Sequence, residues 1–293
     1  DITVQLDANG TATILPEDID NGSIDNCSES LTYSVNIDTF DCADLSTSCT
    51  DYSIDLETNR YALTPDLETF LSDETITLEI WFKAEGQGVL ISELGQAAIN
   101  SGWHASNIEV LSSGEVRARF WGGTWISLGN ITFGEWNHAV ARYNKATSTF
   151  DGMLNGVLSA NSFTFNRSAA YEWGGQYFAF GAYEGQNIGS AQYFNGQINE
   201  VRIWNTARSN DQIAEKMNNC LTGSEAGLMA YYQFEDGPGG TILTDSSPNA
   251  ANGSLTNIDP ASHWVEDIPE SLESGIPVTL TVTDLEGNAA TCI

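Results

Sequence analysis

Basic residues are scarce in this sequence of 293 residues. It contains 10 Lys and Arg against 40 Asp and Glu, a formal net charge of −30. A surface with this charge repels phosphate backbones and anionic membranes, which argues against nucleic-acid binding. Such a surface either stays bare, which keeps a protein soluble, or is partly neutralised by hard cations such as Ca²⁺. Because Asp and Asn are concentrated in the expected turns, we expect Ca²⁺ as a cofactor.

The sequence has no CxxC pair among its five cysteines and only three histidines, so we expect no zinc site. Widely spaced cysteines in an acidic, Trp-rich chain predict disulfides and an exported protein. No signal peptide and no apolar run near 18 residues occurs in the sequence, which predicts no membrane insertion. The chain starts inside a strand pattern, and we expect it to be a piece of a longer protein.

Motifs of hydrolases are also lacking. A retaining glycosidase needs two carboxylates about 5–5.5 Å apart, and no E-x-D-x-(x)-E strand motif supplies them. Glu79 alternates with Thr77 and Trp81 and is a single carboxylate. No G-x-S-x-G motif is present, and no cysteine lies in a nucleophile context. We therefore predict that the chain is not an enzyme.

The residues that are present predict short antiparallel strands. Residues 76–83 alternate between apolar and polar positions, and residues 115–121 place Val116, Ala118 and Phe120 opposite Arg117, Arg119 and Trp121. Asn155–Gly156 supplies the two turn positions of a hairpin. Many such strands with polar turns predict an all-β sandwich or jelly roll.

One helix is predicted after residue 209. Ser209 is a suitable N-cap, and Gln212, three residues later, completes a capping box. Ile213 and Met217 then lie on one face of the helix.

Composition divides the chain into two parts. The ends are Asp-rich and poor in aromatic residues, whereas six of the eight tryptophans lie between residues 81 and 173. Insertions are tolerated at exposed loops when the termini of the inserted domain are close together. We therefore predict a small β domain formed by residues 1–45 plus 275–293, split by a domain of residues 46–274.

The middle of the chain resembles the laminin-G-like, concanavalin A-like jelly-roll family. The resemblance extends over about residues 51–264 and rests on five blocks in the family's order: 75–85, 134–144, 153–160, 194–213 and 227–255. Within the second block, the resemblance implies structural roles for Trp136 and His138.

The two ends resemble one hyalin-repeat-like (HYR-like) module, which is an immunoglobulin-like sandwich. The matching stretches are residues 2–27, 40–45 and 276–292. Such modules are similar to those of very long surface adhesins of gliding Bacteroidetes-type bacteria. The implied fold class is all-β, with a concanavalin A-like jelly-roll β-sandwich inserted into a small Ig-like β-sandwich.

The stretch TDSSPNAANG, residues 244–253, resembles the family's D-S-S-G-N-x-x-x-G signature, which implies a structural Ca²⁺. The predicted metal ligands are Asp245, Asn249 and Glu200. The alternative is an Asx-turn at Asp245, a tight turn at Asn252–Gly253 and no bound ion.

Aromatic residues in two stretches are candidates for a sugar-binding site. Sugar-binding modules stack pyranose faces on exposed aromatics and place polar groups on the hydroxyls. The alternative for each aromatic is a place in the core. The predicted ligand-binding residues are Trp103, Arg119, Trp121, Trp125, Trp173 and Tyr183.

The hyalin-like resemblance suggests a disulfide between Cys27 and Cys292. A Cys49–Cys220 disulfide could join the ends of the inserted domain, which leaves Cys42 over. Other connectivities stay open.

These expectations combine into a function. The chain is expected to be a non-catalytic fragment of an adhesin on the bacterial cell surface, binding extracellular polysaccharide or glycan through the jelly roll. Its role would be gliding motility or surface attachment, and its further partners would be neighbouring modules of the same long chain. The alternatives are a carbohydrate-binding module of a secreted polysaccharide-degrading enzyme and a structural or protein–protein spacer.

Overall fold

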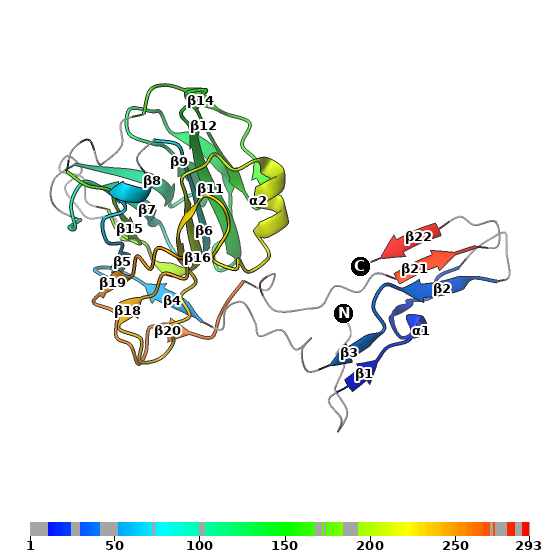
Figure 1. Ribbon diagram of the computed structural model, residues 1–293. Coiled ribbons are helices and arrows are strands. Elements are labelled where there is room, and N and C mark those ends of the chain that lie inside the picture. The colour runs from blue at the N-terminus through cyan, green and yellow to red at the C-terminus, as the bar shows by residue number, and fades with distance from the viewer. Residues whose placement is uncertain are drawn as a thin grey trace. The chain divides into compact units, whose positions relative to one another are not determined.

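The computed structural model describes residues 11–24, 30–41, 52–71, 74–99, 103–167, 172, 174–183, 193–269, 272, 280–284 and 289–292. The chain forms two compact units (Figure 1). The first combines Asp1–Ser48 with Ser274–Ile293, and the second is Cys49–Glu273. The first unit is therefore built from both ends of the chain.

Two small sheets form the first unit. β1 (Thr11–Thr13) pairs with β3 (Thr39–Asp41), and β2 (Thr32–Val35) pairs with β21 (Leu280–Thr283), which pairs with β22 (Ala289–Cys292). The short helix α1 (Pro16–Ile19) begins with proline, whose fixed φ suits this position. The β2–β21 ladder joins segments separated by some 250 residues, with Thr32 opposite Thr283. That this unit is a hyalin-repeat-like, Ig-like module stays a prediction.

The second unit is a sandwich of two antiparallel sheets. The 8-stranded sheet has the order β10 (Ile126–Asn130), β9 (Glu115–Ala118), β8 (His104–Val110), β7 (Gly88–Leu94), β15 (Tyr177–Phe180), β5 (Tyr61–Leu63), β19 (Gly253–Thr256) and β18 (Ile242–Leu243). The main path of the 9-stranded sheet has the order β13 (Val157–Leu158), β12 (Thr149–Leu154), β11 (Trp136–Asn144), β6 (Ile76–Ala84), β16 (Gly196–Trp204), β4 (Ser53–Leu56) and β20 (Trp264–Val265). Two further strands extend that sheet: β14 (Phe163–Thr164) pairs with β12, and β17 (Leu228–Tyr232) pairs with β16. A 3₁₀ turn, η1 (Glu68–Phe70), follows β5. The predicted all-β sandwich is confirmed.

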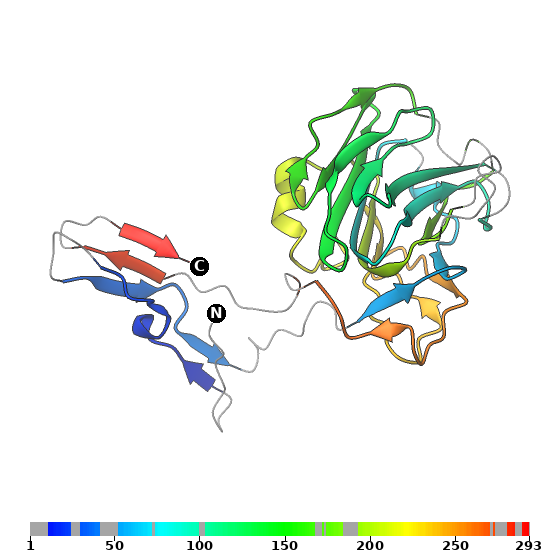
Figure 2. The ribbon, with the colours of Figure 1, turned by 180° about the vertical axis from the view of Figure 1, so that it is seen from behind.

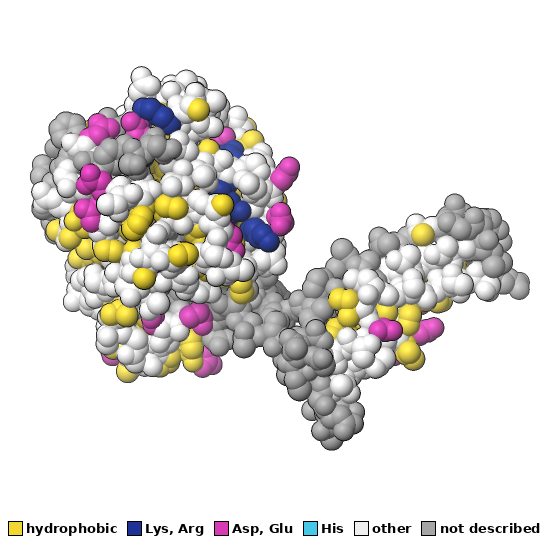
Figure 3. All heavy atoms as spheres, viewed as in Figure 1, with side chains coloured by type: hydrophobic (Ala, Val, Ile, Leu, Met, Phe, Trp, Pro, Cys, Tyr) yellow, Lys and Arg dark blue, Asp and Glu magenta, His cyan; other side chains and the backbone are white. Residues whose placement is uncertain are grey.

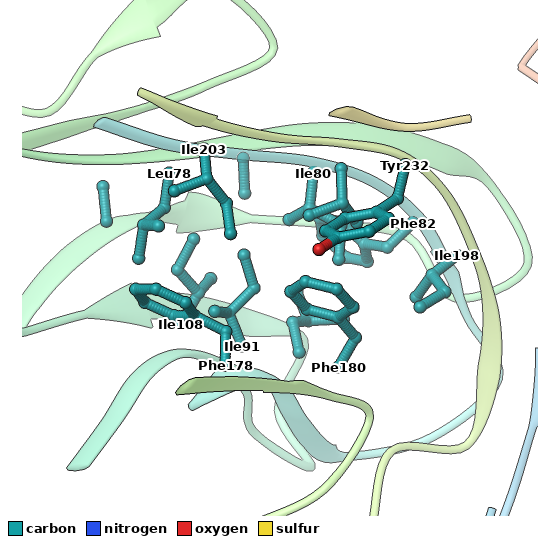
Figure 4. Packing of buried hydrophobic residues seen from close by; sticks show 14 of the residues in the cluster. Leu78, Ile80, Phe82, Ile91, Ile108, Phe178, Phe180, Ile198, Ile203 and Tyr232 are labelled. Carbon is teal, nitrogen blue, oxygen red and sulfur yellow. The ribbon is translucent and has the colours of Figure 1, made fainter. Parts of the chain in front are cut away.

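The hydrophobic core lies between the two sheets (Figure 4). Leu78, Ile80 and Phe82 of β6 extend from the 9-stranded sheet, and Ile108 and Phe178 extend from the 8-stranded sheet to meet them. All five side chains are fully buried. The apolar positions predicted from alternation in residues 76–83 therefore face the core, as expected for strands of a sandwich.

Helix α2 (Asn210–Lys216) covers the outer face of the 9-stranded sheet, so the unit has three layers there (Figure 2). Its predicted capping box is present: the Ser209 hydroxyl accepts a hydrogen bond from Gln212 N at 3.2 Å, and the Gln212 side chain accepts one from Ser209 N at 2.9 Å. Ile213 is buried against Val140 and Met153 of the sheet. The part of this face beneath α2 is consequently also buried.

The predicted hairpin at Asn155–Gly156 is confirmed. Both residues have positive φ angles, 50° and 75°, as a two-residue hairpin of this type requires. Leu154 of β12 pairs with Val157 of β13 directly across the turn. Among the described residues, no helix is long and apolar enough to span a membrane.

Candidate functional site

The candidate site lies on the outer face of the 8-stranded sheet, around β8, β9 and β10. In β9, Val116 and Ala118 are buried in the core, while Arg117 and Arg119 are only partly buried. The alternation continues past the strand, because Phe120 is fully buried and Trp121 is 46% exposed. The predicted separation of these residues onto two faces is confirmed.

Trp121 is the most exposed aromatic side chain among the described residues of this face. It lies in the loop between β9 and β10, and its ring meets that of Trp103 edge to face, with the ring centroids 5.9 Å apart. Trp103 is half-buried, and its indole Nε1 is buried without a hydrogen-bond acceptor. The pair therefore offers an apolar ring to solvent next to an unused donor.

Trp125 lies against two arginines, and its predicted role in ligand binding stays a prediction. The guanidinium carbons of Arg117 and Arg119 lie 4.3 and 4.4 Å from the centroid of its ring. Cations over an indole ring are attracted by its negative face. Trp125 thus helps to orient two arginines at this face.

Glu109 of β8 fixes one of these arginines. Its carboxylate accepts a hydrogen bond from Arg117 Nε at 2.6 Å and another from the Ser106 hydroxyl at 3.0 Å. Glu109 was not among the predicted site residues. Its position between the core residues Ile108 and Val110 is the alternation signal that could have placed it on this face.

Tyr183 lies beside the first residue of β8, at the candidate site. It is 7% exposed, and its ring lies 5.3 Å from that of His104, edge to face. Burial raises the pKa of the Tyr183 phenol above its ordinary value, with Arg119 lowering it and Glu109 raising it. The hydroxyl therefore stays protonated at neutral pH and can donate a hydrogen bond.

The structure brings together five of the six predicted ligand-binding residues on this face: Trp103, Arg119, Trp121, Trp125 and Tyr183. The sixth, Trp173, lies outside the described residues.

The predicted metal ligand Asp245 is fully engaged by hydrogen bonds. One carboxylate oxygen accepts from the backbone N–H groups of Tyr231 and Ser247 at 2.8 and 2.9 Å. The other accepts from the Ser247 hydroxyl at 2.8 Å and from Ala251 N at 2.7 Å. A carboxylate offers about four lone-pair positions. Those of Asp245 are filled by N–H and O–H donors, so this side chain does not fit a Ca²⁺ ion.

Glu200 shares one neighbour with Asp245, because Tyr231 donates its backbone N–H to Asp245 and its hydroxyl to Glu200. Glu200 sits at a bulge of β16 with φ 50°, and Val201 and Ile203 face the core, as predicted. Its carboxylate accepts hydrogen bonds from Arg202 Nη2 at 2.5 Å and from the Tyr231 hydroxyl at 2.7 Å. Glu200 was predicted as the second carboxylate ligand of a Ca²⁺ ion; in this structure its carboxylate is engaged by Arg202 and Tyr231, and the metal site stays a prediction.

The third predicted ligand, Asn249, donates its side-chain N–H to Met229 O at 2.8 Å. Among the residues that the structure describes, no group of three or more His, Cys, Asp or Glu is placed to hold a metal ion. The Asx-turn of the alternative interpretation is present, because Ser247 N donates to Asp245.

Beneath α2, a buried charge network crosses the 9-stranded sheet. Glu79 lies 3.1 Å from Arg208 Nη1, 3.4 Å from His138 Nε2 and 3.9 Å from Arg202 Nη1, and all four side chains are buried. Trp81 packs on His138 with ring centroids 5.3 Å apart. The structural role expected for His138 agrees with this enclosure.

Cys220 is disulfide-bonded. Its predicted partner, Cys49, lies outside the described residues, as do Cys27 and Cys42. For Cys292 only the backbone is described, in β22. The predicted pairings therefore stay predictions.

Two antiparallel sheets with a shared core define a β-sandwich of jelly-roll type. A family model of the concanavalin A-like lectin/glucanases superfamily (Laminin_G_3) matches residues 56–214, more than half of the chain. The chain belongs to this superfamily, which confirms the predicted concanavalin A-like jelly roll. No curated protein matches the sequence.

Solved structures with a similar fold come from several organisms. A Bacteroides ovatus protein, described as a candidate carbohydrate-binding protein, shares 17% identity at a TM-score of 0.52, covering 74% of this chain and 61% of that one. The chain thus spans about three-fifths of that protein. The CBM40 module of the Ruminococcus gnavus IT-sialidase shares 18% identity at a TM-score of 0.42, covering 56% and 94%. A SAP-like pentraxin of Limulus polyphemus shares 14% identity at a TM-score of 0.40, covering 58% and 82%. At these identities the likeness concerns the fold.

Proposed function

We propose that the outer face of β8–β10 binds an extracellular glycan. The observation that carries the proposal is Trp121, which is 46% exposed and supported edge-on by Trp103. An aromatic ring held in place in this way offers a large apolar contact at low entropic cost. Arg119 and the protonated Tyr183 hydroxyl supply polar groups for sugar hydroxyls beside it. The Bacteroides ovatus protein with the same fold, described as a candidate carbohydrate-binding protein, supports this function.

The setting that we propose is a non-catalytic adhesin exposed on a bacterial surface, with roles in attachment or gliding. The resemblance of residues 2–27 and 276–292 to hyalin-like adhesin modules motivates this setting. The same face would serve a carbohydrate-binding module of a secreted polysaccharide-degrading enzyme, and a catalytic domain in the parent chain would favour that alternative. If the domain is a structural or protein–protein spacer, no glycan binds this face.

Replacing Trp121 tests the proposal. We expect Trp121→Ala to lose about tenfold or more in affinity on a glycan array, because one exposed aromatic contributes on the order of 1–2 kcal/mol to such contacts. Phe133→Ala is the matched control, since Phe133 is also exposed (38%) but lies beyond the opposite end of the β9–β10 pair. An array without hits for the wild type, or equal binding by the Trp121 and Phe133 variants, would contradict the proposed site.

A further inference from the structure

Arg119 stands apart from every other basic side chain of the protein. The chain has ten Lys and Arg residues, all of which the structure describes. Nine of them form an ion pair with a carboxylate within 4.0 Å: Arg60, Lys83, Arg117, Arg142, Lys145, Arg167, Arg202, Arg208 and Lys216. Arg119 forms none with the acidic residues that the structure describes, in a chain with 40 Asp and Glu. Its guanidinium also donates no hydrogen bond within the described part of the chain, and its Nε is buried without an acceptor.

The unpaired guanidinium is nevertheless held in position. It lies over the Trp125 ring, whose other cationic neighbour, Arg117, is fixed by Glu109 at 2.6 Å. Nε is buried, but Arg119 as a residue is only partly buried, and its terminal nitrogens make no hydrogen bond to the residues that the structure describes. A flexible surface arginine would be free to turn toward a carboxylate, whereas this one is oriented by stacking before any partner arrives.

The surroundings of Arg119 favour an anionic group on a sugar. A guanidinium matches a carboxylate or a sulfate with two parallel hydrogen bonds, which no neutral hydroxyl can accept equally well. Glu109 is paired with Arg117, so its carboxylate is already engaged and does not neutralise Arg119. Tyr183 adds a protonated hydroxyl, and Trp121 adds an apolar surface for the sugar ring.

The charge of the whole protein limits what kind of anion can approach. Acidic side chains (magenta) are distributed over the visible face of the second unit in Figure 3, and the net charge is −30. A dense polyanion lying along such a surface is repelled, but salt screens charges beyond about 8–10 Å. A single anionic group that reaches Arg119 is therefore favoured over a uniformly charged polymer.

We propose that the glycan bound at this face is acidic and that Arg119 holds its carboxylate or sulfate group. The inference rests on the proposed glycan-binding function and names the chemistry of its ligand. The shared chemistry is an anionic substituent on a saccharide; uronate, sialate and sulfated sugars are its three sources.

A glycan array of neutral, uronate-containing, sialate-containing and sulfated oligosaccharides, probed with the full chain, separates these sources. We expect the hits to fall in acidic classes. Titration calorimetry on each hit and on its uncharged counterpart, the methyl ester or the desulfated sugar, should show at least tenfold weaker binding to the uncharged form. Hits among neutral glycans with equal affinity would overturn the inference while leaving the glycan-binding function in place. No hit in any class would overturn the proposed function itself.

Variants of Arg119 give a second readout. Arg119→Gln should reduce affinity for the acidic hit at least tenfold and remove the preference over its uncharged counterpart, and Arg119→Lys should restore part of it. Lys216→Gln is the matched control, because it removes one positive charge on α2, at the other sheet. Near-ultraviolet circular dichroism verifies the fold of each variant. Wild-type affinity and preference in a folded Arg119→Gln protein would contradict the assignment.

Discussion

Asp245 uses both carboxylate oxygens to accept hydrogen bonds from its own surroundings. Its four donors come from Tyr231, Ser247 and Ala251, and the side chain is 5% exposed. The polar composition of residues 244–253 is thus explained by a connection that satisfies its own backbone N–H groups. Buried donors left without an acceptor would cost free energy.

Asp245→Ala should lower the free energy of unfolding by on the order of 3 kcal/mol, because it leaves three backbone N–H groups without their acceptor. Asp245→Asn keeps one oxygen acceptor and should destabilise less. Urea unfolding followed by tryptophan fluorescence measures both. Since the carboxylate is already saturated, EDTA should leave the melting temperature of the wild type unchanged. A fall in that temperature with EDTA, reversed by added Ca²⁺, would show that our argument about the ligand set is incorrect.

At the scale of elements, α2 and three neighbouring strands enclose charged groups that would otherwise be solvated. Glu79 of β6, His138 of β11 and Arg202 of β16 meet on the sheet face that α2 covers. Arg202 also donates to the backbone carbonyls of Lys216 and Asn219, at the end of the helix, at 2.8 and 2.9 Å. These charge-assisted bonds satisfy the helix carbonyls and attach the helix to the sheet.

This network predicts a pH-dependent stability. Burial lowers the pKa of His138 below 6.5, and Arg202 and Arg208 lower it further, while Glu79 opposes them. Below pH 6.5 the unfolded chain therefore binds a proton that folded His138 does not, so stability is lost as the pH falls. Burial raises the pKa of Glu200, although Arg202 and Tyr231 lower it. A raised carboxyl pKa makes stability fall as the pH rises, which is opposite to the effect of His138. The contribution of His138 to the pH dependence is therefore measured by comparing the wild type with a variant that lacks this histidine.

We expect His138→Gln to reduce the loss of unfolding free energy between pH 6.5 and 5, by up to about 1.4 kcal/mol per pH unit. His138→Gln will itself be less stable at pH 7, because it alters a packed site. The comparison therefore uses the slope of the unfolding free energy against pH and not its absolute value. Chemical denaturation at several pH values measures it. An unchanged slope of unfolding free energy against pH would contradict the prediction. It would mean that folding does not change the protonation of His138 in this range.

At the scale of the whole molecule, the jelly roll contains its complete core. Every residue of the main hydrophobic cluster lies between Ile54 and Trp264, inside the unit Cys49–Glu273. The first unit, in contrast, depends on both chain ends, because β2 pairs with β21.

Residues 49–273 expressed alone should therefore fold, with a melting temperature within a few degrees of the corresponding transition of the full chain. Residues 1–273, which lack β21 and β22, should keep the jelly-roll transition and lose the exchange protection of β2 amides. Calorimetry and hydrogen exchange measure these outcomes. An unfolded 49–273 fragment, or protected β2 amides in 1–273, would contradict this division.

Local sequence determined the elements and the direction in which their side chains face. The alternation of residues 76–83 and 115–121, the Asn155–Gly156 hairpin and the Ser209 cap each depend on neighbouring residues and on backbone geometry, so they could be predicted. The same signals predicted an all-β sandwich or jelly roll and the two faces of residues 115–121, while the concanavalin A-like class came from the family resemblance.

The tertiary structure decided which outward faces stay exposed and which charges meet. Alternation places both Glu79 and Arg119 opposite the core. Glu79 is buried in the network beneath α2, whereas Arg119 forms no ion pair with the described residues. The bulge at Glu200 sets its carboxylate against Arg202, and Trp125 lies under two arginines. The contact of Glu79 with Arg208 joins residues 129 positions apart. All of these contacts depend on strand order, register and layer packing, which no local pattern specifies.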